Sequence, residues 1–159
     1  MRNKLAILAL LLLIPAMAGA GGRSGALHGF SALELLEIEN TRNEQGQKLP
    51  DELIPDLRQQ LLHGLVALHT FHRVEDHVDD AVPSSGAERV VQMKVKITGY
   101  TGAKNQAWVK SEVFLIDKDS GQEVFRSPVN AQLRYDQGAD TSATRKLARS
   151  IVNLVRDSR

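Results

Sequence analysis

The residues with the clearest potential for chemistry are four histidines within fifteen positions, beside several carboxylates. They are His63, His69, His72 and His77, with Glu75, Asp76, Asp79 and Asp80 nearby. Imidazole and carboxylate groups are ligands for zinc and other transition metals. No H-E-x-x-H pair places two ligands on one helical face, so solvated or capping histidines are the simpler interpretation. We expect neither a bound metal nor a cofactor, and keep His69, His72 and His77 as candidate ligands.

A second acidic motif, Asp117-Lys118-Asp119-Ser120-Gly121, is similar to the start of a calcium-binding loop. Its glycine comes one residue early, however, and Pro128 stands where the bidentate glutamate belongs. A hairpin turn explains both aspartates and the glycine. We therefore expect a turn here.

Two groups of side chains suit contact with a partner. Trp108, Phe114 and Ile116 share one face of a predicted strand whose opposite face is also apolar. Either both faces are buried, or the aromatic face is exposed and binds a partner or a second copy.

Arg145, Arg149 and Arg156 share a face of a predicted C-terminal helix, opposite its apolar stripe. They form either an ordinary solvated face or a contact for anionic lipid or an acidic partner. Trp108, Phe114, Arg145 and Arg149 are thus the candidate partner-binding residues.

Catalytic motifs are missing from the sequence. It has no G-x-S-x-G, S-x-x-K or G-K-[ST] motif, and it contains no cysteine. Aromatic residues are few and positive charge is not concentrated, so nucleic acid is not an expected partner. We expect a protein that is not an enzyme.

The elements that position these residues follow from apolar periodicity. Strands are predicted at residues 32–39, 71–75, 91–98, 108–116 and 124–133, and helices at 51–68 and 141–156. The apolar run of the first strand changes parity once, and Pro128 places the last strand at an edge or at a bulge. The pattern predicts an α+β sandwich, a twisted and mainly antiparallel five-stranded sheet with two helices on one face, in the order β-α-β-β-β-β-α.

The N-terminus resembles a secretory signal peptide. Arg2 and Lys4 precede an apolar run of about ten residues and an A-x-A site, and cleavage fits after Ala18 or Ala20. The run is too short for a transmembrane span. We expect a signal peptide at residues 1–20, a flexible linker at 21–30 and one domain at 31–157. With no cysteine to carry a lipid anchor, the exported chain is expected to be soluble, periplasmic or secreted.

One family resemblance rests on the order of these motifs. It uses the Leu49-Pro50 helix start with Leu53 and Leu57, the Phe71-x-Arg73-Val74 strand, the Asp117–Gly121 hairpin and the terminal helix. Together they resemble uncharacterised bacterial envelope domains related to the TolB amino-terminal domain and to CsgG. The resemblance implies a non-enzymatic binding or envelope-assembly module with a protein partner or self-association. The alternative is a periplasmic metal or small-ligand binder that uses residues 63–77.

Overall fold

The computed structural model describes residues 25–77, 88–103, 106–134 and 139–159. The predicted signal peptide, residues 1–20, lies outside these ranges, as do Asp79 and Asp80. The elements are β1 (Ala32–Asn40), a 3₁₀ turn (Asp51–Leu53), α1 (Ile54–Ala67), β2 (Arg73–Asp76), β3 (Val90–Ala103), β4 (Gln106–Asp117), β5 (Glu123–Arg134) and α2 (Ala139–Asp157).

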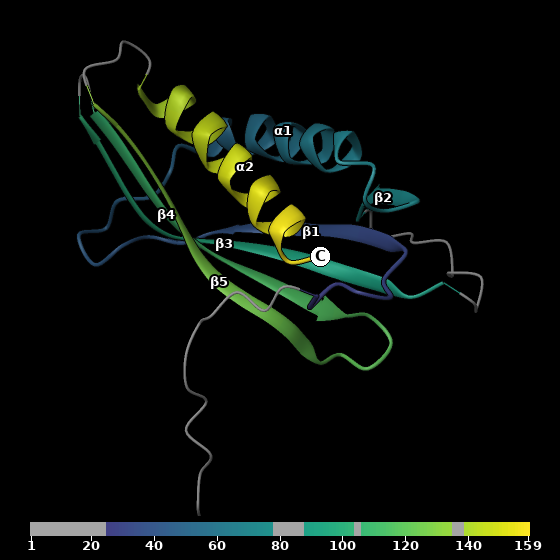
Figure 1. Ribbon diagram of the computed structural model, residues 1–159. Helices are drawn as coiled ribbons and strands as arrows, with labels where there is room; N and C mark the ends of the chain where they lie inside the picture. The colour runs from purple at the N-terminus through teal and green to yellow at the C-terminus, as the bar shows by residue number, and fades with distance from the viewer. Residues whose placement is uncertain (1–24, 78–87, 104–105, 135–138) are drawn as a thin grey trace, which may run out of the picture.

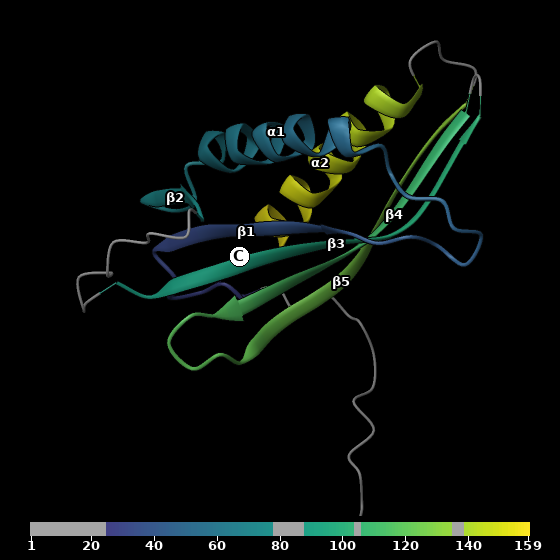
Figure 2. The same cartoon turned by 180° about the vertical axis from the view of Figure 1, so that it is seen from behind.

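The strands form one sheet in the order β2-β1-β3-β4-β5. β1 runs parallel to both β2 and β3, whereas β3, β4 and β5 are antiparallel neighbours. The sheet is therefore mixed, because α1 connects β1 to β2 as the crossover that a parallel pair requires. Both helices lie on the same face of the sheet (Figures 1 and 2). This confirms the predicted α+β fold, its element order and its two helices on one face.

The change of parity in β1 is a bulge. Leu35 pairs with Met93 and Ile38 pairs with Val95, so β1 takes three residue steps where β3 takes two. The extra residue lets Leu35 and Ile38 both enter the core, where each is buried. The bulge also turns the backbone of Leu36 and Glu37 away from regular pairing.

The alternation in β3 is confirmed, and it defines the two faces of the sheet. Val91, Met93, Val95 and Ile97 are fully buried under the helices, while the residues between them are half-buried on the opposite face. Leu57, Leu61 and Leu65 of α1 and Leu147 and Ile151 of α2 complete the core. We call this second face, which neither of the two described helices covers, the helix-free face of the sheet.

Helix α1 contains two residues that are unusual in helices, Pro55 and Gly64, and the structure shows why each is tolerated. Pro55 lies in the first turn, where its missing N–H has no intrahelical acceptor to lose. Gly64 lies against α2, and a Cβ atom there would stand 2.6 Å from Cγ2 of Val152. Glycine therefore permits a close approach of the two helices.

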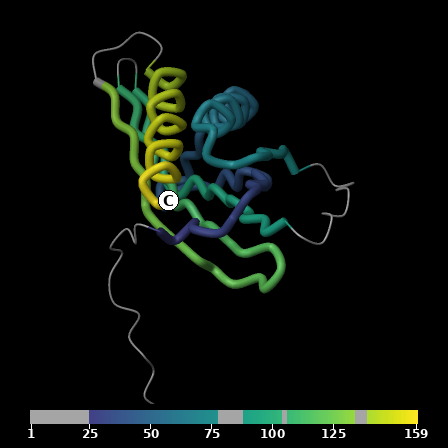
Figure 3. The backbone as a smooth tube through the Cα atoms, turned by 45° about the vertical axis from the view of Figure 1, so that its right-hand side comes forward, coloured from purple at the N-terminus to yellow at the C-terminus, as the bar shows by residue number. Residues whose placement is uncertain are grey.

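The predicted linker at residues 21–30 needs a correction in its second half. Residues 25–30 form a turn, and Leu27 and Phe30 are buried in the core. The backbone N–H of Leu27 donates to the carbonyl oxygen of Ser158, 3.1 Å away, so this segment lies beside the C-terminus (Figure 3). The apolar side chains of Leu27 and Phe30 outweigh the flexible composition around them.

Candidate functional site

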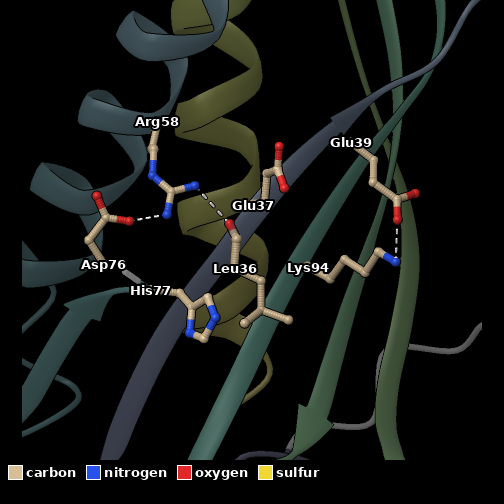
Figure 4. A pocket seen from close by; sticks show the side chains of 7 residues that line it. All are labelled: Leu36, Glu37, Glu39, Arg58, Asp76, His77 and Lys94. Atoms are coloured by element: carbon tan, nitrogen blue, oxygen red, sulfur yellow. Dashed lines mark hydrogen bonds and ion pairs between the residues drawn. The ribbon is translucent and has the colours of Figure 1, made fainter. Parts of the chain in front are cut away.

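A pocket of about 600 Å³ lies beside the bulge in β1, past the end of the short strand β2 (Figure 4). It is lined by Leu36, Glu37, Glu39, Arg58, Asp76, His77 and Lys94. Arg58 reaches across from α1 and donates to the carbonyl oxygens of Leu36, at 2.9 Å, and Leu35, at 3.1 Å, and also to Asp76. The carbonyl oxygen of Leu35 also accepts from the backbone N–H of His77 at 3.0 Å, so Arg58 adds a second donor to Leu35 and a donor to Leu36 beyond the end of β2.

His77 connects this pocket to a buried carboxylate. Glu34 is only 3% exposed, and Nδ1 of His77 lies 2.6 Å from its Oε1. Oε2 of Glu34 accepts from Nε2 of Gln92 at 2.8 Å and pairs with Nζ of Lys118 at 3.1 Å. Burial alone raises the pKa of Glu34, but the hydrogen bonds from Gln92, His77 and Lys118 together lower it below its usual value. Glu34 is thus a charged group that joins β1, β3, the chain after β2 and the β4–β5 turn.

The remaining charges of this pocket are also largely paired. Lys94 contacts Glu39, and Arg58 contacts Asp76. Glu37 is the only charged lining residue without a hydrogen bond or ion pair to another described residue. A histidine oriented by a carboxylate can serve as a general base, but neither a serine nor a threonine is among the described lining residues. The arrangement mainly holds β1 and β2 together.

The structure does not bring the four histidines together in one pocket. His63 lies on the exposed side of α1, and His69 follows α1 with a positive φ of 50°. His69 and His72 are exposed, whereas His77 contacts Glu34. The described residues contain no group of three or more histidines and carboxylates placed to hold a metal ion. Metal binding by residues 63–77 remains a prediction.

Asp117 forms the expected turn. Its Oδ1 accepts from the backbone N–H of Asp119 at 3.0 Å and of Ser120 at 3.3 Å, and Oδ2 accepts from Arg89 at 2.7 Å. Gly121 closes the turn with a φ of 67°, in the left-handed region that favours glycine. Both oxygens of the Asp117 carboxylate therefore already accept hydrogen bonds, Oδ1 from the turn and Oδ2 from Arg89.

The helix-free face of the sheet carries the predicted aromatic residues. Trp108, Phe114 and Ile116 are all half-buried there, so this face is neither a second core nor fully exposed. Nζ of Lys110 lies 4.1 Å from the centre of the Trp108 ring, and the guanidinium of Arg126 lies 4.6 Å from that of Phe114. These cations cover part of each ring. We call the half-buried Trp108, Phe114 and Ile116, with Lys110 and Arg126, the open face.

Arg145 and Arg149 are brought to a groove between α1 and α2. The groove has a volume of about 430 Å³, and its lining residues are Gln60, His63, Gly64, Arg145, Ala148, Arg149, Val152 and Asn153. Arg156, predicted to act with them, instead pairs with Asp157, and Lys146 donates to the carbonyl oxygen of Gln132. The predicted cationic face is therefore divided, and only its first half lines the groove.

Some of these functional residues could not be found from the sequence. Glu34 and Lys118 meet His77 across the sheet from distant positions. His77 was predicted only as a candidate metal ligand, and nothing local distinguishes Glu34 from the other two glutamates of β1. His63 was named only as a member of the histidine cluster, and the structure places it in a groove with Arg145 and Arg149.

None of the described helices is long and apolar enough to cross a membrane. No known family model matches the sequence, and no match is found among curated proteins. The similarity of this chain to known proteins is therefore judged from solved structures.

Several solved structures share the fold. The PelC dodecamer from Paraburkholderia phytofirmans has 20% sequence identity and a TM-score of 0.57, covering 86% of this chain and 94% of that one. A single-residue variant of the same dodecamer has 16% identity and a TM-score of 0.56, covering 83% and 92%. Protein XCC0632 from Xanthomonas campestris has 7% identity and a TM-score of 0.53, covering 79% and 81%. At these identities the likeness establishes the fold, and the resemblance to TolB and CsgG domains stays a prediction.

Proposed function

We propose that this chain is a non-enzymatic assembly module of the bacterial cell envelope that associates with copies of itself through the open face. The observation that carries the proposal is that both helices cover one face of the sheet, while Trp108 and Phe114 stay half-buried on the other. A second copy packed there would remove the remaining aromatic surface from water, which favours association.

The β5 edge of the sheet is a poorer site for self-association than its face. β5 is an edge strand, as Pro128 predicted, and that proline has no N–H to offer an added strand. Farther along β5, the carbonyl oxygen of Gln132 already accepts from Nζ of Lys146 at 3.1 Å. The two solved PelC structures with the same fold are dodecamers, which supports a second copy as the partner.

Envelope location rests on the sequence. The first twenty residues have the pattern of a secretory signal peptide, and the chain has no cysteine for a lipid anchor. The absence of recognised catalytic motifs supports a binding role.

Light scattering coupled to gel filtration tests the proposal on protein isolated from the envelope of bacteria expressing the full sequence. We expect a mass above that of one chain, and a lower mass for Trp108→Ser and for Phe114→Ser. Val66→Ser is the matched control, because Val66 is a large apolar residue, 54% exposed, on α1. Its mass should equal that of the wild type.

Circular dichroism shows whether each variant keeps the fold. A wild-type protein that stays monomeric at about 100 µM would overturn the proposal, and so would two folded variants that associate as the wild type does. Two variants are used so that unfolding of one leaves the other informative.

A further inference from the structure

We propose that the groove between α1 and α2 is a separate binding site for an acidic peptide segment of a partner protein, held through Arg145 and Arg149. The proposal does not depend on self-association, since the groove lies on the helix layer and the open face lies on the opposite side of the sheet.

The floor of the groove follows from the packing of the two helices. Gly64 has no side chain, and the position of its missing Cβ is 2.6 Å from Cγ2 of Val152. Gly64, Ala148 and Val152 therefore form a small, apolar floor. A volume of about 430 Å³ falls within the range of sites that bind small ligands or a few residues of a peptide.

The charges on the rim lack partners in the part of the chain that the structure describes. Arg145 and Arg149 are exposed, and neither side chain has a hydrogen bond or ion pair to any other described residue. No aspartate or glutamate is among the described residues that line the groove, and His63 lies on the α1 side. By contrast, a carboxylate pairs with each of five other arginines, Arg58, Arg73, Arg89, Arg126 and Arg156.

This arrangement is complementary to a carboxylate on a peptide. Arg145 and Arg149 lie one turn apart on α2, and each guanidinium can hold a carboxylate through two parallel hydrogen bonds. Asn153 adds an amide group that can bond a peptide backbone, whereas Nε2 of Gln60 already donates to Oδ2 of Asp56 at 2.7 Å. The apolar floor suits side chains between the acidic ones.

A membrane surface fits the same cations less well. Binding to anionic lipid needs a broad basic face. Lys146 of α2 donates to the carbonyl oxygen of Gln132, and Arg156 pairs with Asp157, so Arg145 and Arg149 are the cations of this helix left without a partner among the described residues. Two cations at one groove form a small basic area, which suits a short acidic peptide better than a layer of anionic headgroups.

Fluorescence anisotropy tests the site with a labelled hexapeptide that alternates glutamate and leucine. We expect saturable binding at about 50 mM salt, weakened about tenfold by Arg145→Gln and by Arg149→Gln, because each removes one charged hydrogen-bonding group. Arg42→Gln is the matched control, since it removes the same charge from an exposed loop outside the groove. It should bind as the wild type does.

Three results would overturn the proposal. The first is equal binding of a peptide with glutamine in place of glutamate. The second is an equal loss in Arg42→Gln, which would indicate a general charge effect. The third is binding of phosphatidylglycerol vesicles without binding of the peptide, which would assign the arginines to a lipid surface. Light scattering of the same variants separates this test from that of self-association, because their mass should not change.

Discussion

The pocket beside the β1 bulge and the groove between the helices are both lined by charged and polar side chains, yet they use them differently. In the pocket, Arg58, His77 and Lys94 each contact an acidic group of the protein. In the groove, Arg145 and Arg149 contact none among the described residues. The first set stabilises the fold, whereas the second remains available to bind something else.

The difference has a structural cause. The bulge and the early end of β2 place the carbonyl oxygen of Leu36 outside the regular strand pairing of β1, and buried polar groups must be satisfied. Arg58 donates a hydrogen bond to this carbonyl oxygen. The groove lies between two regular helices whose backbone N–H and C=O groups bond each other within each helix. Its side chains are therefore not required as partners for the backbone. The comparison predicts that matched substitutions in the two regions affect stability unequally.

The largest difference is expected for Glu34→Gln. The change leaves Lys118 and His77 beside a neutral group in a buried position, which we expect to lower the free energy of unfolding by about 2 kcal/mol. Urea denaturation measures it. Glu37→Gln, on the same strand but exposed and unpaired among the described residues, should change stability by less than about 0.5 kcal/mol. Equal effects would show that the Glu34 cluster is not a stabilising one.

Arg58→Gln and Arg149→Gln make the same comparison between arginines. Loss of Arg58 removes donors to two carbonyl oxygens and to Asp76, so we expect a decrease of about 1.5 kcal/mol in the free energy of unfolding. Arg149→Gln should stay within about 0.5 kcal/mol of the wild type. Thermal unfolding of both variants and of the wild type measures these changes in stability. A larger loss for Arg149→Gln would reverse the roles assigned to the two regions.

Gly64→Ala tests the packing that forms the floor of the groove. Alanine favours a helix by about 1 kcal/mol over glycine, but its Cβ would clash with Val152. Overpacking of this kind costs about 1–3 kcal/mol, so we expect a net loss of about 1 kcal/mol. Gln59→Ala, at an exposed position of α1, is the control and should be near neutral. A stabilised Gly64→Ala variant would mean that the helices are not in close contact there.

The smallest expected effect is a pH dependence. The pKa of Glu34 is lowered in the folded protein, so its contribution to stability is present above the unfolded value of 4.5 and is lost as pH falls through the folded pKa. The stability difference between wild type and Glu34→Gln should therefore be largest near neutral pH and shrink below pH 4.5. Denaturation curves at several pH values measure it. A difference that is constant down to about pH 3 would be inconsistent with a charged Glu34.

Periodicity predicted the fold well because most of its signals are local. The alternation of β3, the apolar stripes of both helices and Pro128 at an edge each depend on neighbouring residues. Even the parity change in β1 was visible as a pattern, and the structure shows that it is a bulge. The parallel pairing of β1 with β3 was not predictable in the same way, because it depends on strands far apart in the sequence.

The candidate sites were harder to predict for the same reason. Arg145 and Arg149 were recognised as an exposed cationic face, but the groove also requires Gly64 on another helix. The histidines were grouped because they are close in sequence, whereas the structure separates His63 from His77. Residues 25–30 were expected to be flexible because composition does not show that Leu27 reaches the core.

The most direct test of self-association uses Trp108, which is the only tryptophan in the sequence and lies on the open face. Its fluorescence should shift to shorter wavelength, and its quenching by iodide should decrease, as the protein concentration is raised through the association range measured by light scattering. Phe114→Ser should delay both changes to higher concentration. Fluorescence and quenching that stay constant while the wild-type protein associates would contradict the account, because the interface would then lie away from the open face.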